Sequence, residues 1–437
     1  MRLIASISSG RVLRAATFVA VAVALLSGCQ SPVRLMPSPI KFTSSEIDFV
    51  ADKHPDQFSP DMRVFYATNR SVLIGGPDPI HTIFPADNLR LGVAHVRVGD
   101  GSMSPDEMRA LSTSTDGRRR PALNLARMEQ LAVLAPDAAV EDSPDALAYF
   151  AQINAALSRS ASKGLIIYVH GANNPVWRGT AQAAQFQHFN GGGAVVLSFL
   201  WPSAGSILSY ATDVRHTRAS IPAFVRLVEM LARHTDAQKI DILAYSAGAQ
   251  IVSPALAILA TPRADESRTE LRARLRLGSI YFAAPDEDTR RFADHLAQYA
   301  DATSRVTVAA NLNDSVLGWA ARHHGTSRAG RPDPDELDEG QTQFLIDASN
   351  RRNCDLLKVD PQTLPGLGRR SHNFWMSHPW VSTDVLIMFR RDAAPLDRAL
   401  VPNEMPRGTR FWTFGPDYED RIRAVLRMSV EAATAPQ

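Results

Sequence analysis

Short, almost unbroken apolar runs recur along the chain from residue 165 onward, separated by segments with helical periodicity. The runs expected to form strands are residues 165–171, 194–202, 240–246, 277–285, 305–314 and 354–360. Because apolar residues follow one another instead of alternating with polar ones, we expect these strands to be covered on both faces. The apolar stripe of residues 218–232 suits such a cover, with Pro222 tolerated only near the first turn of its helix. The pattern predicts an α/β fold with a mostly parallel sheet and helices on both faces.

The first third of the chain is patterned differently. Residues 62–68 form a short β-rich run, residues 90–98 alternate as in a half-buried strand, and residues 145–160 have a helical period. The intervening residues 100–140 have mixed polarity. We expect them to be a solvated surface insertion, with a cap over a substrate cleft as the alternative.

The N-terminus has the pattern of an export signal. Three arginines precede an uncharged apolar run, residues 15–26, which leads into LLSGC ending at Cys29. The apolar run is shorter than the roughly 20 residues that a membrane-spanning helix needs. Positive charge, an apolar run and small residues before a cysteine are typical of a secretory signal with a lipobox.

This segment resembles the signal peptides of bacterial lipoproteins. The resemblance implies that residues 1–29 are a lipoprotein signal peptide and that Cys29 becomes the acylated first residue of the mature protein. Gln30 follows the cysteine, and the absence of aspartate there favours the outer membrane. We therefore expect a lipid-anchored protein of the bacterial cell envelope, held at the outer membrane and facing the periplasm.

The rest of the chain is predicted to be a tether followed by one domain. Residues 30–60 are rich in serine and proline, as expected of a tether between membrane and domain. Residues 61–437 are predicted to form one α/β domain. It ends in an extension, residues 392–437, in which an amphipathic helix from about Asp417 is expected to pack on the domain.

Composition and charge exclude several functions. The 437 residues are 45% hydrophobic and 21% charged, which allows a sizeable core. The net charge of +2 and the lack of a long basic block argue against nucleic acid as a partner. No HExxH pattern or other cluster of metal ligands occurs, so no metal or other cofactor is expected. Cys354 is expected to be a buried thiol on a strand, and the chain is not a disulfide scaffold.

One strand leads directly into a candidate nucleophile. The run KIDILAY ends at Ser246, Gly248 follows two residues later, and residues 250–260 are compatible with a helix. A sharp turn between strand and helix, built from small residues, is how a nucleophile elbow exposes its serine. Ala244 replaces the first glycine of the GxSxG pattern, and a methyl group is the smallest such change.

Polar residues follow the other predicted strands. The carboxyl ends of parallel strands meet at one edge of a sheet, so these residues are the ones expected to bind ligands. The first inner strand ends in His170 and Gly171, where an α/β-hydrolase places its oxyanion loop. We predict that the NH groups of Ala172 and Ala247 stabilise the oxyanion and that His170 shapes the loop.

The acid and the base each have several candidates. Asp314 follows the second strand after the serine and is favoured, with Asp286 or Asp288 as the alternative acid. The carboxylates not used as the acid are expected to cap helix N-termini. Among the histidines after Asp314, His372 is favoured as the base, and His378 is expected at the surface or in a supporting position. The other two histidines after Asp314 are His323 and His324.

Together the motifs resemble a bacterial α/β-hydrolase family of poorly defined function. The motifs are VFYATNR, IYVHGANN, FLWPSAGS, AYSAGAQ, AAPDED, NLND and SHNFWMSHP, spread over about residues 63–389. The resemblance implies Ser246 as nucleophile, Asp314 as acid and His372 as base. The chain departs from the usual family pattern at positions next to the serine, namely Tyr245, Ala247 and Gln250.

These observations predict an envelope-anchored serine hydrolase that cleaves an ester through an acyl-enzyme, with a carboxylesterase or lipase-like activity. Its substrate is expected to be a small-molecule or lipid ester, and its only other partner the membrane that holds the anchor. An acyltransferase with the same triad and a non-catalytic envelope binding protein are the alternatives. Four aromatic residues near the predicted site loops could form an apolar acyl pocket or belong to the core: Trp201, Tyr245, Phe374 and Trp375.

Overall fold

The computed structural model describes residues 32–40, 59–112, 119–206, 209–350, 353–405 and 408–434. The predicted signal peptide, its Cys29 and most of the predicted tether lie outside these residues. Within them, no helix combines the length and the apolar character needed to cross a membrane.

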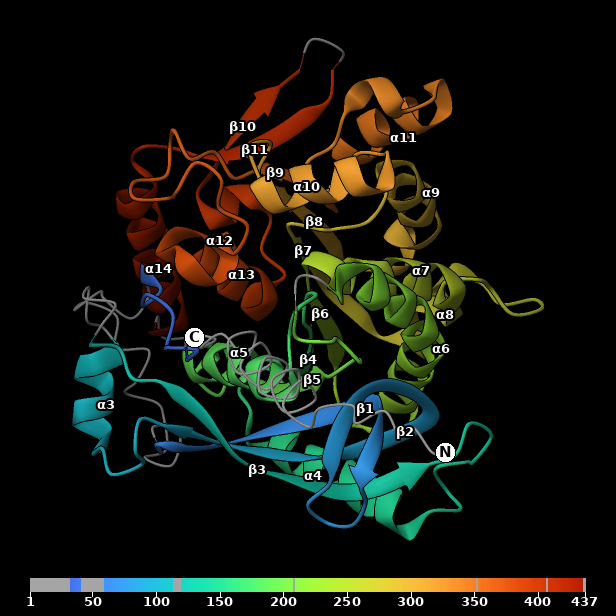
Figure 1. The fold of residues 1–437 in the computed structure, drawn as a ribbon. Helices are drawn as coiled ribbons and strands as arrows, with labels where there is room; N and C mark the ends of the chain where they lie inside the picture. The colour runs from blue at the N-terminus through green and yellow to red at the C-terminus, as the bar shows by residue number, and fades with distance from the viewer. Residues whose placement is uncertain are drawn as a thin grey trace, which may run out of the picture.

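The described strands form one eleven-stranded sheet. The strands are β1 (Asp61–Ile74), β2 (Ile80–Val98), β3 (Leu123–Leu134), β4 (Gly164–Val169), β5 (Ala194–Phe199), β6 (Lys239–Tyr245), β7 (Leu277–Ala283), β8 (Arg305–Ala310), β9 (Cys354–Lys358), β10 (Leu400–Glu404) and β11 (Arg410–Phe414). Their order is β10-β11-β9-β8-β7-β6-β4-β5-β1-β2-β3, which Figure 1 shows from top to bottom. All pairs from β11 to β1 are parallel, and antiparallel pairs add β10 at one edge and β2 and β3 at the other.

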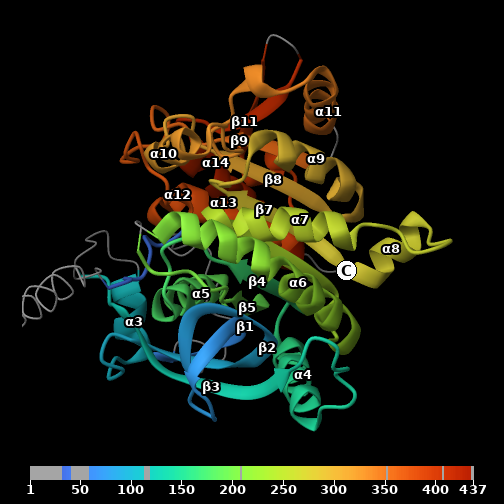
Figure 2. The ribbon, with the colours of Figure 1, turned by 45° about the vertical axis from the view of Figure 1, so that its right-hand side comes forward.

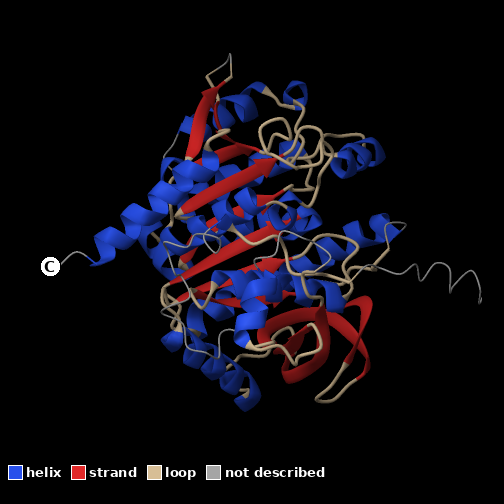
Figure 3. Cartoon of the chain, turned by 90° about the vertical axis from the view of Figure 1, so that its left-hand side faces the viewer, coloured by secondary structure: helices blue, strands red, loops and turns tan. Residues whose placement is uncertain are grey.

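Helices cover both faces of this sheet (Figures 2 and 3). They are α3 (Pro105–Ser112), α4 (Pro144–Arg159), α5 (Val176–Asn190), α6 (Tyr210–His234), α7 (Ala249–Leu259), α8 (Arg268–Leu275), α9 (Thr289–Tyr299), α10 (Ser315–His324), α11 (Glu339–Asn350), α12 (Phe374–Ser377), α13 (Pro379–Arg391) and α14 (Tyr418–Thr434). One buried cluster joins α4, α6, α7, α8 and α9 to one face, and a second joins α5, α12, α13 and α14 to the other. Ile166 and Ile167 of β4 belong to different clusters, because successive side chains of a strand point to opposite faces.

The prediction of a mostly parallel α/β sheet with helices on both faces is confirmed. The six apolar runs after residue 165 correspond to the parallel strands β4 to β9. The expectation for Pro222 is wrong: α6 begins at Tyr210, so this proline lies inside the helix. The helix continues past the lost hydrogen bond because Phe224 and Leu227 bury its apolar stripe in the core.

Residues 100–140 are neither a cap nor a loose surface insertion, which corrects both expectations. They include the short helix α3 and the edge strand β3, which pairs with β2 along its whole length. In the order of the sheet, five strands, β2, β1, β5, β4 and β6, separate β3 from β7. This segment is a strand because residues such as Leu123 and Leu134 bury apolar side chains against the core.

Part of the predicted tether also packs on the domain. The NH of Leu35 donates to the Pro121 carbonyl oxygen (3.0 Å), and the NH of Ile40 donates to the Thr383 hydroxyl (2.9 Å). Leu35, Met36 and Ile40 are buried in the cluster that contains α13. The expectation of a free tether is therefore wrong for residues 32–40, because this stretch carries enough apolar surface to dock.

The C-terminal extension is an integral part of the sheet. β11 pairs with β9 in parallel, and α14 buries Tyr418 and Leu426, as expected of a helix from about Asp417. The fully buried Arg398 joins this segment to the rest by ion pairs with Asp384 of α13 (2.9 Å) and Asp355 of β9 (2.7 Å). The described residues 392–405 and 408–434 thus complete one edge of the domain.

Candidate active site

Ser246 lies directly after β6, in a short 3-10 turn that leads into α7. Its φ of 52° lies in the left-handed region, which costs free energy for any residue except glycine. The turn approaches β4 closely: a Cβ added at Gly248 would lie 2.7 Å from a main-chain carbonyl oxygen of that strand. A Cβ added at Gly171 would lie 2.9 Å from the Cβ of Ser246. Glycine is therefore required at both positions, whereas the methyl group of Ala244 is accommodated in the core.

Three loops at the carboxyl edge of the sheet bring together Ser246, His372 and Asp314. The Ser246 Oγ lies 2.8 Å from the His372 Nε2, and the His372 Nδ1 lies 2.6 Å from the Asp314 Oδ2. Because a carboxylate only accepts hydrogen bonds, the Nδ1 carries the proton and the Nε2 accepts from the serine hydroxyl. The ring of Tyr245 packs beside the imidazole, with the two ring centres 5.3 Å apart.

Asp314 is held in place by the helix that follows it. Its Oδ1 accepts hydrogen bonds from the NH groups of Val316 (2.9 Å) and Leu317 (3.0 Å), in the first turn of α10. The carboxylate is fully buried, so these NH groups and the helix dipole supply the stabilisation that water would otherwise give. Both oxygens are therefore used, one by the helix and one by the imidazole of His372.

The two alternative acids have other partners than His372. Asp286 is paired with the buried Arg328, whose Nε lies 2.6 Å from the Asp286 Oδ1, and its Oδ2 accepts from the Tyr210 hydroxyl (2.6 Å). Asp288 caps the N-terminus of α9. Neither carboxylate contacts His372. The expectation that an unused carboxylate caps a helix holds for Asp288 and is wrong for Asp286, which forms an ion pair instead.

The other candidate histidines do not reach the serine. His378 is buried, not at the surface, and supports the loop before His372: its Nε2 lies 3.0 Å from the Pro365 carbonyl oxygen, and it caps the N-terminus of α13. His323 and His324 end α10 and pack against a tyrosine ring on α6.

The two predicted oxyanion donors lie on neighbouring turns, Ala172 after β4 and Ala247 after β6. Ala172 lines the cavity at Ser246, and Ala247 is the residue after the serine. Two NH groups that point toward the reacting oxygen would stabilise a developing oxyanion, which is the role predicted for these two.

A buried carboxylate holds the loop after β4. The Oδ2 of Asp213, on α6, accepts from the NH of Asn173 (3.0 Å) and from the Ser203 hydroxyl (2.8 Å). The Nδ2 of Asn174 donates back to the carbonyl oxygens of Gly171 (3.0 Å) and Ala172 (3.0 Å). The loop therefore has little freedom to turn its NH groups away.

Arg70, in the second half of β1, contacts the loops after β4 and β5. Its guanidinium donates to the carbonyl oxygens of Asn174 (3.1 Å) and Ser203 (3.3 Å). Burial lowers the pKa of Arg70 to about 9, while the nearby Asp213 carboxylate opposes this shift, so the side chain remains charged at neutral pH. Sequence reasoning missed the roles of Arg70 and Asp213. The signal available in the sequence was that a charged residue continues a strand whose side chains have to be buried.

His170 shapes the loop and does not contact the serine. It is fully buried, its ring stacks on that of Trp201 with centres 5.1 Å apart, and its Nδ1 donates to the Gly171 carbonyl oxygen (2.8 Å). Burial, assisted by the charge of Arg70, lowers the pKa of His170 to about 3. The imidazole is therefore neutral under ordinary conditions.

A cavity of about 290 Å³ opens at Ser246. Its walls combine apolar side chains with a few polar ones: Ala172, Asn173, Asn174, Arg178, Gln182, Ser206, Tyr210, Tyr245, Asp286, Val316, Trp319, His372, Asn373 and Met376. Of the four aromatic residues considered for an acyl pocket, only Tyr245 lines the cavity. Trp201, Phe374 and Trp375 are core residues, because each is fully buried.

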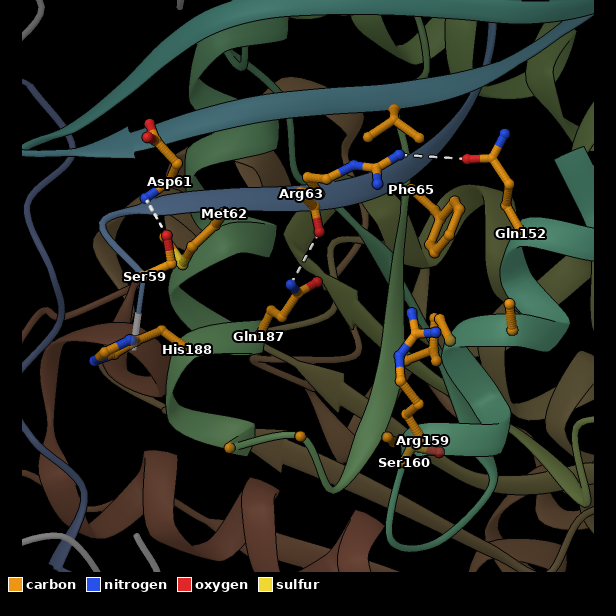
Figure 4. Close-up of a pocket in the computed structure, with 17 residues that line it drawn as sticks. Ser59, Asp61, Met62, Arg63, Phe65, Gln152, Arg159, Ser160, Gln187 and His188 are labelled. Carbon is orange, nitrogen blue, oxygen red and sulfur yellow. Dashed lines mark hydrogen bonds between the residues drawn. The ribbon is translucent and has the colours of Figure 1, made fainter. Parts of the chain in front are cut away.

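A larger cavity, of about 660 Å³, lies at the opposite end of the parallel strands, where β1 and β5 begin (Figure 4). It is formed by the first residues of β1 and β5 and the last residues of α4 and α5, and it includes none of the candidate catalytic residues. Figure 4 shows Arg63 of this cavity donating to Gln152, and Arg159 on the adjacent helix.

Comparison with known proteins gives a family match. A family model described as alpha/beta hydrolase of unknown function (DUF900) matches residues 146–381, more than half of the chain. The matched region includes Ser246, Asp314 and His372. No curated protein matches the chain. In the part of the chain that the structure describes, no group of three or more His, Cys, Asp or Glu residues is suited to a metal ion.

We predict that the His170 imidazole stays neutral from pH 8 to pH 5, whereas an exposed histidine titrates near pH 6.5. Because the folded pKa is below the unfolded one, the unfolded chain takes up the extra proton in this window, and the free energy of unfolding falls as the pH drops. The loss at pH 5 is expected to be about 2 kcal/mol, and His170→Gln should remove it. Imidazole NMR and denaturation at both pH values measure the two effects. A His170 resonance that titrates near pH 6.5 would contradict the prediction.

Proposed function

This chain belongs to that family of alpha/beta hydrolases of unknown function, and on this premise we propose that it is a serine hydrolase that cleaves carboxylic esters through an acyl-enzyme on Ser246. The observation that carries the proposal is the continuous hydrogen-bonded chain from the Ser246 Oγ through His372 to Asp314. A nucleophile, a base and a group that orients the base are then all within hydrogen-bonding distance.

In the proposed acylation step, the Ser246 Oγ attacks the ester carbonyl carbon while its proton moves to the His372 Nε2. Asp314 holds the imidazole in the required tautomer and stabilises the imidazolium that forms. The tetrahedral intermediate then collapses, the bond to the leaving alcohol breaks, and the His372 Nε2 returns the proton to the alcohol oxygen. Water attacks the acyl-enzyme in the same way, which releases the acid and restores the serine.

The oxyanion would be stabilised by the NH groups of Ala172 and Ala247. Each donor of this kind is typically worth about 3 kcal/mol of transition-state stabilisation. That value depends on donors that are already oriented, which is the role we assign to Asp213 and Arg70. Arg70 also places a positive charge behind the loop, where the negative charge develops.

The cavity supports a small ester group at the reacting centre. Its volume of about 290 Å³ is at the lower end of the range for ligand pockets. Val316, Trp319 and Met376 give it apolar walls for an acyl or alkyl group. A longer chain on the substrate would have to extend beyond this cavity.

The proposal includes a location, supported by the sequence alone. Acylation at Cys29 would anchor the enzyme in the bacterial cell envelope, at the outer membrane and facing the periplasm. Small-molecule esters and lipid esters of that compartment would then be its candidate substrates.

Covalent labelling tests the nucleophile. The full-length wild type is expected to react with a fluorescent fluorophosphonate and Ser246→Ala is not, because the probe needs the serine oxygen that His372 activates. Ser158→Ala, at an exposed serine of α4, should label like the wild type. Hydrolysis of p-nitrophenyl esters of increasing acyl length then measures the preferred chain. A folded wild type that neither labels nor hydrolyses would refute the proposal.

A matched pair of variants tests the acid. Asp314→Asn is expected to lower kcat by about 10³- to 10⁴-fold, because an amide does not stabilise the imidazolium and permits the wrong tautomer. Asn still caps a helix, so α10 should remain intact. Asp288→Asn, at the cap of α9, should leave kcat close to the wild-type value. Steady-state kinetics on one p-nitrophenyl ester measure both, and the reverse order of the two effects would contradict the assignment.

Palmitate incorporation tests the anchor. Cells that express the wild type are expected to transfer radiolabelled palmitate to the protein, and Cys29→Ala should lose both the label and sedimentation with membranes. Cys354→Ala is the control, because the chain has two cysteines and Cys354 is buried in β9. Label that survives in Cys29→Ala would show that the anchor is elsewhere.

A further inference from the structure

Beside the candidate active site lies a second cavity, of about 390 Å³, which we call the arginine pocket. It is lined by Asn313, Ser315, Arg322, Arg331, Arg369 and Arg370. Four of these six side chains are guanidinium groups, and no carboxylate lines the pocket. Such a concentration of one charge is unusual in a chain whose net charge is only +2.

The four guanidinium groups have no acidic counterpart in the described residues. None of them forms an ion pair there, whereas Arg274, Arg305 and Arg328 each have a carboxylate within 2.9 Å. Four like charges around one cavity repel one another and produce a strongly positive potential. An anion that enters the pocket would remove this repulsion, so the arrangement favours a multiply charged ligand.

The arginine pocket is built into the fold. The Arg331 Nη1 donates to the Asp314 carbonyl oxygen (3.0 Å), and a Cβ added at Gly318 would collide with this guanidinium. The main chain at Arg369 and Arg370 accepts hydrogen bonds from the side chains of Asn311 (3.4 Å) and Ser315 (3.5 Å). Arg331 is thus fixed, while Arg322, Arg369 and Arg370 are exposed and can turn toward a ligand.

The pocket adjoins the cavity at Ser246. Ser315 and Arg322 lie on one face of α10, and Val316 and Trp319, which line the cavity at the serine, lie on the neighbouring face. The pocket residues Asn313 and Ser315 also flank Asp314 in the sequence, and Arg370 precedes His372 by two residues. A ligand with its ester at Ser246 could therefore place another group in the arginine pocket by crossing the start of α10.

We propose that the arginine pocket binds the phosphate group of the substrate, so that the ester cleaved at Ser246 belongs to a phosphate-bearing alcohol. Guanidinium groups bind phosphate through paired hydrogen bonds, and phosphate offers more oxygens and more charge to several arginines than a carboxylate does. The inference rests on the proposed function. The phosphate could belong to a membrane phospholipid or to a soluble phosphate ester.

The first experiment measures binding without catalysis. Titration calorimetry of inorganic phosphate into full-length Ser246→Ala should detect a site, and adding Arg369→Gln and Arg370→Gln should weaken it at least tenfold, because both charge-assisted contacts to the phosphate are then lost. Arg159→Gln is the matched control, since this exposed arginine lies at the opposite end of the parallel strands (Figure 4). Equal affinity in the double arginine variant and the control would overturn the proposal.

The second experiment compares two esters with the same acyl chain, lauroyl glycerol phosphate and lauroyl glycerol. The wild type should favour the phosphate ester in kcat/KM, and the double arginine variant should reduce that ratio at least tenfold, whereas Arg159→Gln should preserve it. A ratio that is unchanged by the double variant would overturn the proposal.

A third comparison identifies the source of the phosphate. A preference seen with dibutyryl glycerol phosphate in solution points to a soluble ester. A preference seen only in vesicles, for phosphatidylglycerol over diacylglycerol, points to a membrane lipid. The absence of a preference in both settings counts against the phosphate site. Failure of the proposed function would leave every ester uncut and Ser246 unlabelled, while phosphate binding to Ser246→Ala would still report on the pocket.

Discussion

The close packing of the serine turn against the end of β4 is the constraint on which the rest of the site depends. Ser246 adopts a left-handed conformation that only surrounding contacts can maintain. Gly248 and Gly171 allow those contacts, because a side chain at either position would push the turn and the oxyanion loop apart. The parallel sheet makes this approach possible, since β4 and β6 are neighbours that end at the same edge. The serine turn, the loop after β4 and the ends of two strands therefore form one rigid unit.

Buried charges surround this unit, and each has a partner that explains its burial. Asp213 accepts hydrogen bonds from the loop after β4 and from the loop after β5. Arg70 donates hydrogen bonds to carbonyl oxygens of the same two loops. Asp314 is satisfied by the start of α10 and by His372. Isolated buried charges would be strongly destabilising, so these hydrogen bonds keep the loops in a single arrangement. The orientation of the donors is thus a property of the loops as a group.

Several arginines gather at the end of the sheet where the proposed chemistry takes place. Arg70 lies behind the oxyanion loop, Arg178 lines the cavity at the serine, and the arginine pocket begins on the neighbouring face of α10. This distribution favours an anionic substrate and also the oxyanion that forms on it. The larger cavity lies at the opposite end of the parallel strands and includes none of the candidate catalytic residues.

The amino-acid sequence by itself determined the parallel strands, the turn after β6 and a short set of candidate acids and bases, because these depend on periodicity and on the order of residues along the chain. The tertiary structure decided which candidates meet: Asp314 reaches His372, while Asp288 caps a helix and Asp286 pairs with Arg328. It also placed residues 32–40 on the domain, made β3 an edge strand and revealed the roles of Arg70 and Asp213. These outcomes depend on contacts between segments far apart in the sequence, and local patterns carry no information about which distant partner a buried charge or an apolar stretch will find.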